Sequence, residues 1–235
     1  DGWLGRYLDQ RYPGYPDTTP VHPMALQIGS TTALLLQGPK YPMGMSVSDP
    51  EQFYRIIAGT DISGSEKPDL STPAGLELDY IQRIAAEAIS YAKPVRDIFN
   101  AMPNKVTYAS GTVANQLKIV ARLIGGGLDT PIYIISQRGY DTHADQKPRH
   151  QSLLGDLSAG ITSFFDDLAA MGVADRVLLM TVSEFGRRAQ ANNLGTGKEG
   201  TDHGTALPVI FAGPTLKPGV YGYNPDLSNL KNGDI

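Results

Sequence analysis

The sequence predicts an α/β protein in three layers (αβα), in which helices cover both faces of a mostly parallel sheet, together with an irregular lobe rich in loops. From residue 111 onward, apolar segments of strand length alternate with segments whose apolar residues recur at helical spacing. This alternation is typical of a parallel sheet with helices on its faces. Residues 1–110 differ, because turn-forming stretches such as "RYPGYPDTTP" and "QGPKYPMGM" interrupt them.

These two patterns give the expected domain organisation. We expect a single domain over residues 1–235, with an irregular and partly helical lobe at 1–110 and an α/β core at 111–235. Within the lobe, the apolar run Ala33–Leu36 is predicted to be a strand, and "MALQIG" at 24–29 is a candidate second strand.

A long helix is predicted at residues 73–101, where apolar side chains recur every three or four positions. Ser71 and Thr72 supply a cap before it, and Pro73 suits the first helical turn because its missing N–H would have no partner there. Pro94 is expected to kink or break the helix, because its ring removes a backbone hydrogen bond.

The α/β core is predicted from five further elements. The polar connection from Ser183 to Ala206 has little apolar content, and loops beyond about 12–15 residues are usually functional or disordered. We interpret it as functional. The predicted elements are a helix at about Thr112–Ile124 that ends at Gly125–Gly127, a strand at Ile132–Ser136, a helix from about His150 to Met171, and strands at Arg176–Val182 and Pro208–Ala212.

Composition excludes several classes of function. The chain has 235 residues, 41% of them hydrophobic, and a formal net charge of −4, so it can form a core and has no basic surface for nucleic acid. With no cysteine, disulfides, zinc–thiolate sites and cysteine nucleophiles are excluded. Any metal must bind to His, Asp or Glu, because there is no cysteine. No apolar run approaches the roughly 18 residues of a membrane span.

Acidic and histidine residues gather around the ends of the predicted strands. Carboxyl ends of parallel strands meet at one edge of a sheet, where ligands bind. Imidazole and carboxylate together suit Zn, Mn or Fe, and carboxylate alone suits Mg or Ca, so we expect a divalent metal, Zn first among these. An arginine beside it suits an anionic group. The candidates are the metal ligands Asp141, His143, Glu184, Asp202 and His203, and the anion contact Arg187.

Each piece also has a simpler interpretation. The stretch from Asp141 to His143 could be a hydrogen-bonded turn, Glu184 could be a carboxylate at a helix N-terminus, and Asp202 with His203 could be a turn before a strand. The histidines would then only form hydrogen bonds in a polar cleft. Other catalytic motifs are missing: there is no G-x-S-x-G or H-E-x-x-H, and "GTGKEG" at 195–200 lacks the leading Gly and the Ser/Thr of a phosphate loop.

Several stretches resemble one bacterial family. They are "GWLGRYLD" at 2–9, "GYDTHADQ" at 139–146, "FFDDLAAMGVADRVLLMTVSEFGRR" at 164–188, "GTDHG" at 200–204 and "YNPDLSNLKNGDI" at 223–235. Together they resemble domain-of-unknown-function family 1501, which is placed in the alkaline phosphatase and sulfatase superfamily and is typically exported by the twin-arginine (Tat) route. The resemblance implies an alkaline phosphatase-like fold and a periplasmic or secreted location.

The resemblance also implies ligand roles. Enzymes of this superfamily commonly use two metal ions about 4 Å apart to hold a phosphoryl or sulfuryl group. Asp141 and His143 resemble the ligands of one metal, although only one residue separates them, and His203 resembles a ligand that returns to it. Glu184 stands where the Asp of a second pair is expected, but Phe185 replaces its His.

Phenylalanine cannot bind a metal, so the resemblance implies a second site that is weakened or uses other ligands such as Asp202. Family members extend beyond both ends of this sequence, so we expect Asp1–Ile235 to be an internal portion of a longer protein, with the nucleophile outside it. The implied function is a metal-dependent hydrolase that acts on small phosphate or sulfate esters, or a diverged relative. The alternative is a secreted binding or structural protein that keeps a single metal site.

Overall fold

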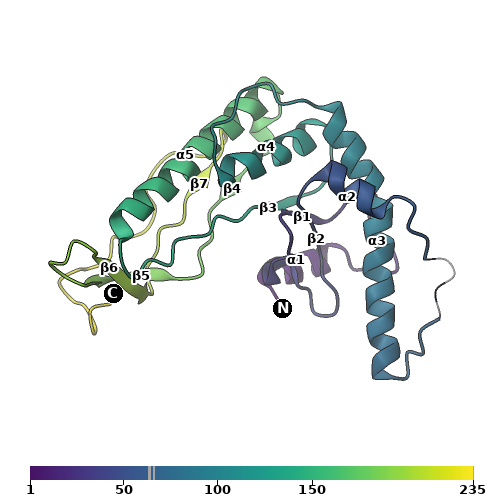
Figure 1. Ribbon diagram of the computed structural model, residues 1–235, viewed down its shortest axis with the longest axis horizontal. Coiled ribbons are helices and arrows are strands. Elements are labelled where there is room, and N and C mark those ends of the chain that lie inside the picture. Colours follow the sequence, from purple (N-terminus) through teal and green to yellow (C-terminus); the bar gives the residue numbers. More distant parts are fainter. Residues whose placement is uncertain (63–64, 66, 235) are drawn as a thin grey trace. The chain divides into compact units, whose positions relative to one another are not determined.

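The computed structural model describes residues 1–62, 65 and 67–234, which form a mixed α/β protein (Figure 1). Two compact units are present. The first contains residues Asp1–Asn104 and Gln116–Ser136, and the second contains Lys105–Asn115 and Gln137–Ile235.

A three-stranded parallel sheet forms the centre of the first unit. Its order is β2-β1-β3, with β1 at Ala25–Ile28, β2 at Met45–Val47 and β3 at Ile132–Ile134. In the register, Leu26 of β1 lies between Met45 and Tyr133. All four residues of β1, including the polar Gln27, are buried, and the other three are apolar, as expected of a strand covered on both faces. The candidate strand at 24–29 is thus confirmed.

The predicted strand at Ala33–Leu36 is wrong, because Leu34–Leu36 form a single 3₁₀ turn, η1. This turn leaves Leu34 84% exposed and buries Leu36 completely. A short apolar run without β-branched residues does not distinguish a strand from a helical turn. Packing decides here, because one leucine of the turn enters the core.

The core beside the sheet brings distant segments together. Leu8 comes from α1 (Trp3–Arg11), an N-terminal helix that the sequence analysis did not predict, and it packs with Ala25, Leu36 and Met43. Close approach between α1 and the turn after η1 requires glycine, because a Cβ on Gly5 would lie 2.2 Å from the carbonyl oxygen of Gln37.

Two further helices of the first unit are α2 (Pro50–Ile57) and α3 (Pro73–Ala101). The predicted cap of α3 is confirmed, because the Thr72 hydroxyl accepts a hydrogen bond of 3.0 Å from the backbone N–H of Gly75. Pro94 lies inside α3 and does not break it. Its neighbours Tyr91 and Val95 are buried, so packing offsets the missing backbone hydrogen bond.

Helix α4 (Thr112–Gly125) confirms the predicted helix and its end at the triple glycine. The Leu128 N–H donates to Leu123 O at 2.9 Å, the Gly127 N–H donates to Ile124 O at 3.1 Å, and Gly127 has φ +89°. This hydrogen-bond pattern closes helices whose chain reverses through a left-handed residue, where glycine has no Cβ to clash.

The second unit contains α5 (Gln146–Ala170), which begins one turn before the predicted His150. Phe164 and Leu168 of α5 are buried, and so is Asp167, which is 0% exposed. The Asp167 carboxylate accepts hydrogen bonds from Lys105 N at 2.6 Å and from the Tyr108 hydroxyl at 3.0 Å. A buried acid is stable there because it is hydrogen-bonded.

The last two predicted strands are shorter than expected and are not part of the parallel sheet. After the 3₁₀ turn η2 (Ala174–Arg176), β4 covers Leu179–Met180 and pairs antiparallel with β7 (Phe211–Ala212). Met180 is 39% exposed and Phe211 is 52% exposed, so these strands lack the two covered faces of a central parallel strand. The prediction that they extend the parallel sheet is wrong within the described residues.

The connection predicted as a loop between Ser183 and Ala206 contains a β-hairpin. Strand β5 (Gly186–Asn192) pairs antiparallel with β6 (Gly200–Gly204). The polar sequence of β5, "GRRAQAN", has no apolar alternation, which is why the strand signal is missing from the sequence. The turn between the strands uses left-handed backbone at Asn193 and Gly195.

Candidate metal centre

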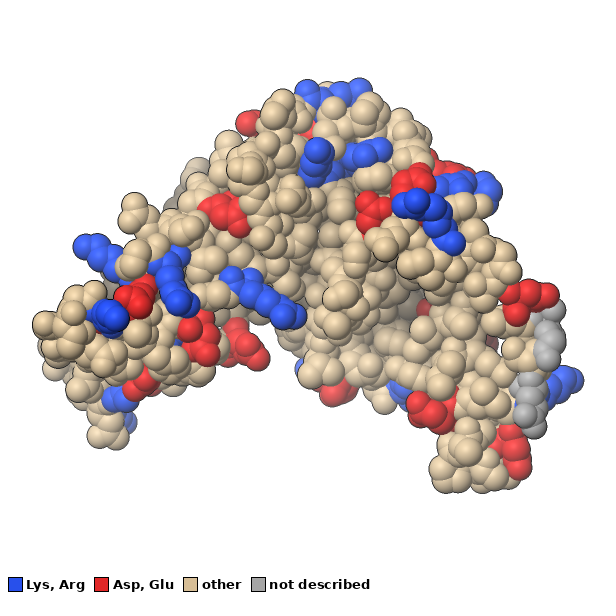
Figure 2. All heavy atoms as spheres, viewed as in Figure 1, with Lys and Arg blue, Asp and Glu red and all other residues tan. Residues whose placement is uncertain are grey.

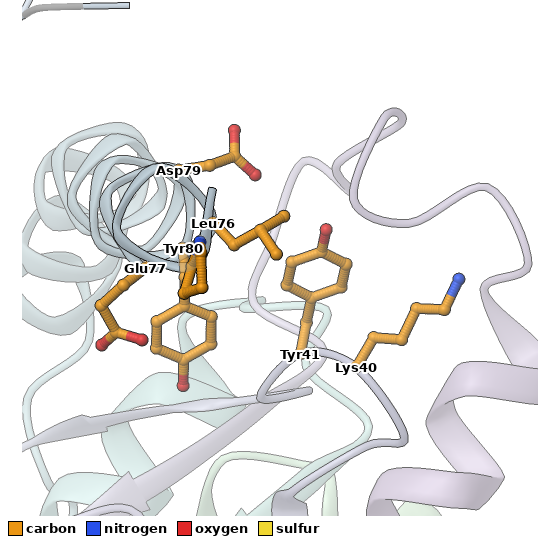
Figure 3. Close-up of a pocket in the computed structure, with 7 residues that line it drawn as sticks. Lys40, Tyr41, Leu76, Glu77, Asp79 and Tyr80 are labelled. Atoms are coloured by element: carbon orange, nitrogen blue, oxygen red, sulfur yellow. The ribbon is translucent and has the colours of Figure 1, made fainter. Parts of the chain in front are cut away.

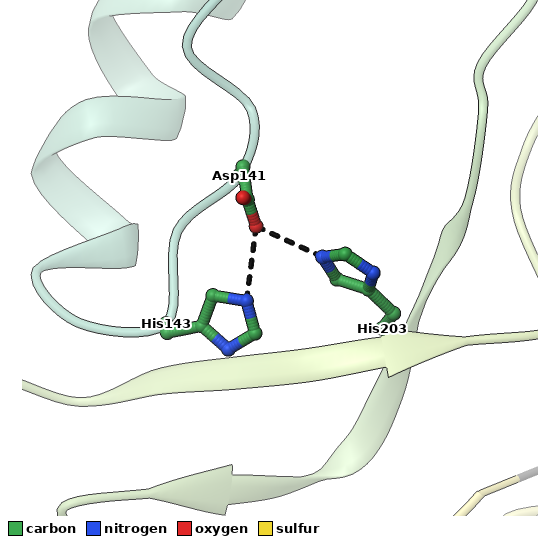
Figure 4. Close-up of side chains that lie close together, drawn as sticks. All are labelled: Asp141, His143 and His203. Atoms are coloured by element: carbon green, nitrogen blue, oxygen red, sulfur yellow. Dashed lines mark hydrogen bonds and ion pairs between the residues drawn. The ribbon is translucent and has the colours of Figure 1, made fainter.

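Three predicted ligands meet in the second unit (Figure 4). Asp141 and His143 lie in the segment before α5, and His203 lies on β6. The Asp141 Oδ1 atom is 2.9 Å from His203 Nε2 and 3.0 Å from His143 Nε2. The side chains of Asp141, His143 and His203 are 62%, 49% and 48% exposed. The cluster is therefore accessible to solvent.

The segment that carries Asp141 and His143 is anchored to α5. Thr142, between them, is 1% exposed, and its Oγ1 lies 3.0 Å from His150 Nε2 on α5. The Tyr140 ring packs edge-on against the same imidazole, with a centroid distance of 5.6 Å. One helical histidine therefore fixes the backbone between two candidate ligands.

Backbone contacts fasten the same segment to β6. The Thr201 N–H donates to Thr142 O at 3.3 Å, and the Gln146 N–H donates to Glu199 O at 3.0 Å. Gly200 lies so close to the segment that a Cβ on it would be 2.2 Å from the carbonyl carbon of His143. The approach of β6 therefore requires glycine at this position.

Arg187 lies across from His203 in the β5–β6 register. Its guanidinium donates to the carbonyl oxygens of Tyr140 and Thr201 and to Asp141 Oδ1, the last at 3.3 Å. The predicted role of Arg187 as an anion contact stays a prediction. In this geometry the side chain joins the ligand segment to β6 and places positive charge beside Asp141.

Asp202 and Phe185 contact the two imidazoles from outside the cluster. Asp202 Oδ1 lies 2.8 Å from His143 Nδ1, on the opposite side of the ring from Asp141. The Phe185 ring stacks on the His203 ring at a centroid distance of 3.8 Å and an interplanar angle of 6°. Asp202 is a predicted metal ligand, and Phe185 stands where the resemblance implies a histidine ligand.

Glu184, the remaining predicted ligand, is exposed and lies outside the cluster of Asp141, His143 and His203. Across residues 1–62, 65 and 67–234 the structure gives it no hydrogen bond or ion pair. Asn192, Tyr140 and Thr142 were not predicted as functional residues. Tyr140 and Thr142 lie within the stretch "GYDTHADQ" at 139–146, whereas no motif in the sequence marks Asn192.

The surrounding donors favour the ionised form of both nearby carboxyls. The hydrogen bond from His203 lowers the pKa of Asp141, with further contributions from His143 and Arg187. The hydrogen bond from Asn192 lowers the pKa of Asp202, followed by the one from His143. Carboxylates bind metals in the deprotonated form, so Asp141 is in its ligand form at neutral pH.

The donor set suits a divalent metal. A tetrahedral Zn²⁺ ion with bonds of about 2.0–2.2 Å separates neighbouring ligand atoms by about 3.3–3.5 Å. The two N···O distances at Asp141 are 2.9 and 3.0 Å, so the atoms need to separate by only about 0.5 Å to reach those bond lengths. A cation bound at the centre would take the place of these direct contacts of the two Nε2 atoms with Asp141 Oδ1.

A surface pocket in the first unit is a separate feature (Figure 3). Its volume is about 510 Å³. Asp79 in its wall forms a salt bridge of 2.8 Å with Arg83 on the same helix, which neutralises one of its charges. The pocket is lined by Lys40, Tyr41, Pro73, Leu76, Glu77, Asp79 and Tyr80.

The charged surface shows no large area of one sign on the face drawn in Figure 2, where acidic and basic side chains lie among one another. Among the helices of the described residues, none has both the length and the apolar character needed to cross a membrane. The expected absence of a nucleic-acid partner stays a prediction.

The fold and the cluster define a mixed α/β protein with a histidine and aspartate group on a hairpin and its neighbouring segment. The family model described as "Protein of unknown function (DUF1501)" matches residues 81–232, more than half of the chain, and includes every candidate ligand. The protein therefore belongs to this family. Neither the curated proteins nor the solved structures contain a significant match.

Proposed function

We propose that Asp141, His143 and His203 bind one divalent metal ion, Zn²⁺ in the first instance, and that the protein is a metal-dependent hydrolase of phosphate or sulfate esters. One observation carries the proposal: two imidazole Nε2 atoms converge on a single carboxylate oxygen at 2.9 and 3.0 Å. Two histidines and one carboxylate are a ligand set of catalytic zinc, while Mn, Fe, Ca and Mg remain alternatives.

Exposure of the cluster supports a catalytic site. Structural zinc sites are closed by four protein ligands, whereas catalytic sites keep a position for water or substrate. An ion held there would supply Lewis acidity and an activated water. The chain itself contributes the positive charge of Arg187, which lies 3.3 Å from Asp141 Oδ1 and attracts an anionic ester.

Thr142 and His150 form a hydroxyl–imidazole pair, the kind of contact that activates a nucleophile. Thr142 is only 1% exposed, so a substrate does not reach its hydroxyl in this conformation. The pair therefore serves to hold the ligand segment.

The finer parts of the proposal rest on the family and on the "SEFGR" and "TDHG" stretches. They are a three-layer fold like that of alkaline phosphatase, export by the twin-arginine route, and a periplasmic or secreted location. Membership of the family supports them because they are what the resemblance implies for that family.

A second candidate is a non-catalytic protein that a metal stabilises. It is favoured by the origin of the ligands, because Asp141 and His143 belong to one segment and His203 to another, 62 positions away from Asp141. An ion bound by all three would cross-link the segment and the hairpin, and its binding energy would then add to folding stability.

Metal titration tests the proposal. Dialysed protein should bind about one equivalent of Zn²⁺, measured by inductively coupled plasma mass spectrometry, and Asp141→Asn and His203→Ala should abolish this binding. His22→Ala is the matched control, because His22 accepts a hydrogen bond from Asp129 N in the first unit. Absence of metal after reconstitution, or Zn²⁺ binding by Asp141→Asn and His203→Ala equal to that of the unchanged protein, would contradict the site.

Hydrolysis and stability measurements separate the two candidates. The hydrolase should release p-nitrophenol from p-nitrophenyl phosphate or sulfate in a metal-dependent manner in the natural full-length protein. The structural candidate instead predicts no turnover and a large fall in the melting temperature when a chelator removes the metal.

A further inference from the structure

We propose that Asp202 and Phe185 are positioning residues of the metal centre. Asp202 sets the ring of His143 through Nδ1, and Phe185 sets the ring of His203 by stacking, so that both imidazoles present Nε2 to the ion. The inference rests on the proposed metal site and concerns two residues that do not bind the metal themselves.

The contacts of His143 separate the roles of two carboxylates. Asp141 Oδ1 lies 3.0 Å from Nε2, and Asp202 Oδ1 lies 2.8 Å from Nδ1. The two nitrogens of an imidazole point away from each other, so a metal bound at Nε2 lies on the far side of the ring from Asp202. Metal-binding histidines commonly donate their other N–H to a carboxylate, which fixes the tautomer and the ring orientation. Asp202 therefore acts through His143.

Asp202 is itself held in place. Its Oδ1 accepts a second hydrogen bond from Asn192 Nδ2 at 2.8 Å, and Arg188 Nη1 lies 3.8 Å from its Oδ2. Both partners come from β5, the strand paired with the one that carries Asp202. The hairpin thus supplies a carboxylate in a defined position behind His143.

His203 is oriented by a different interaction. The Phe185 ring is nearly parallel to the imidazole, 6° apart at 3.8 Å, and it precedes β5. The Arg187 guanidinium lies 5.0 Å from the centroid of the Phe185 ring. Parallel contact across a whole ring face opposes tilting of the imidazole. Phe185, which stands where the resemblance implies a histidine, therefore supports the ring of His203.

Zinc affinity tests the inference, measured by competition with a chromophoric chelator, together with the visible spectrum of the Co²⁺ form. Asp202→Asn keeps the size and the hydrogen-bond acceptor but loses the charge, and it should weaken zinc binding by about 10- to 100-fold at unchanged stoichiometry. The Co²⁺ bands should keep their positions, because the ligands are unchanged. Asn192→Ala should weaken binding in the same direction but less, and it provides a second test if Asp202→Asn does not fold.

Phe185→Leu should weaken zinc binding by about 2- to 10-fold, since it removes a stacked ring pair. Phe185→Tyr should restore the affinity. Glu184→Gln is the matched control, because it removes an exposed neighbouring carboxylate and should change neither affinity nor spectrum.

Three results overturn the inference. A Co²⁺ spectrum of Asp202→Asn with shifted bands and reduced coordination would make Asp202 a ligand. Wild-type affinity in both Asp202→Asn and Asn192→Ala would remove its positioning role, and wild-type affinity in Phe185→Leu would do the same for Phe185. Failure of the unchanged protein to bind Zn²⁺ or Co²⁺ refutes the metal site itself, which is a separate outcome.

Discussion

Replacement of Thr142 by valine tests whether the anchor beneath the ligand segment matters for metal binding. Thr142 is 1% exposed, and its hydroxyl lies 3.0 Å from His150 Nε2. Valine fills nearly the same volume but leaves the imidazole without this partner. Loss of one such hydrogen bond costs about 1–2 kcal/mol. If all of that free energy helps to hold Asp141 and His143 in the arrangement that binds the metal, its loss lowers zinc affinity by about 5- to 30-fold.

Urea unfolding of the metal-free protein measures the stability change, and chelator competition measures the affinity change. Thr142→Ser should retain most of the affinity, because it keeps the hydroxyl. Thr162→Val is the matched control on α5, where the exposed hydroxyl donates only to Ser158 O. If Thr142→Val lowers the unfolding free energy and zinc affinity stays at the wild-type value, the anchor does not position the ligands and the reasoning is refuted.

Two other predictions concern a partly buried acid and a close backbone approach. Burial raises the pKa of Glu87 above its ordinary value of 4.5. Its contribution to the free energy of unfolding is therefore complete at a pH below 4.5 and is lost as the pH rises through the folded-state pKa. Glu87→Gln should therefore raise the urea midpoint at pH 7 but not below about pH 4, whereas the exposed control Glu77→Gln should change neither; an equal effect at both pH values would contradict this. Gly200→Ala should lower the unfolding free energy by about 1–3 kcal/mol and weaken zinc binding, because its Cβ would lie 2.2 Å from the His143 carbonyl carbon. On α5, a Cβ at Gly155 would meet nothing within 4 Å, so a comparable loss in Gly155→Ala would show that the effect is not specific.

Elements with strong local signals were predicted closely. The cap at Thr72 and the glycines after α4 fix helix ends through local hydrogen bonds, so the residues involved are neighbours in the sequence. The short elements were not predicted as well. Leu34–Leu36 form a turn, and β4 and β7 pair with each other, because apolar character alone does not specify the partner of a short segment.

For the candidate site, the sequence provided residue types and approximate positions. It named Asp141, His143 and His203, which the structure brings together, and it also named Glu184, which lies outside the cluster. The sequence predicted that His203 precedes a strand of the parallel sheet. It lies instead on a strand of the polar β5–β6 hairpin.

The sequence by itself determined the α/β class, the long helices and the histidine and acid donors, because helical periodicity, caps and composition are local properties. Only the tertiary structure decided which nitrogen of each imidazole faces Asp141, and that Asp202 lies behind His143. The contacts of His143 with Asp202 and of His203 with Asp141 join residues 59 and 62 positions apart. They depend on the pairing of β5 with β6 and on the anchoring of Thr142 by α5, and neither a polar hairpin nor a single hydroxyl leaves a periodic pattern in the sequence.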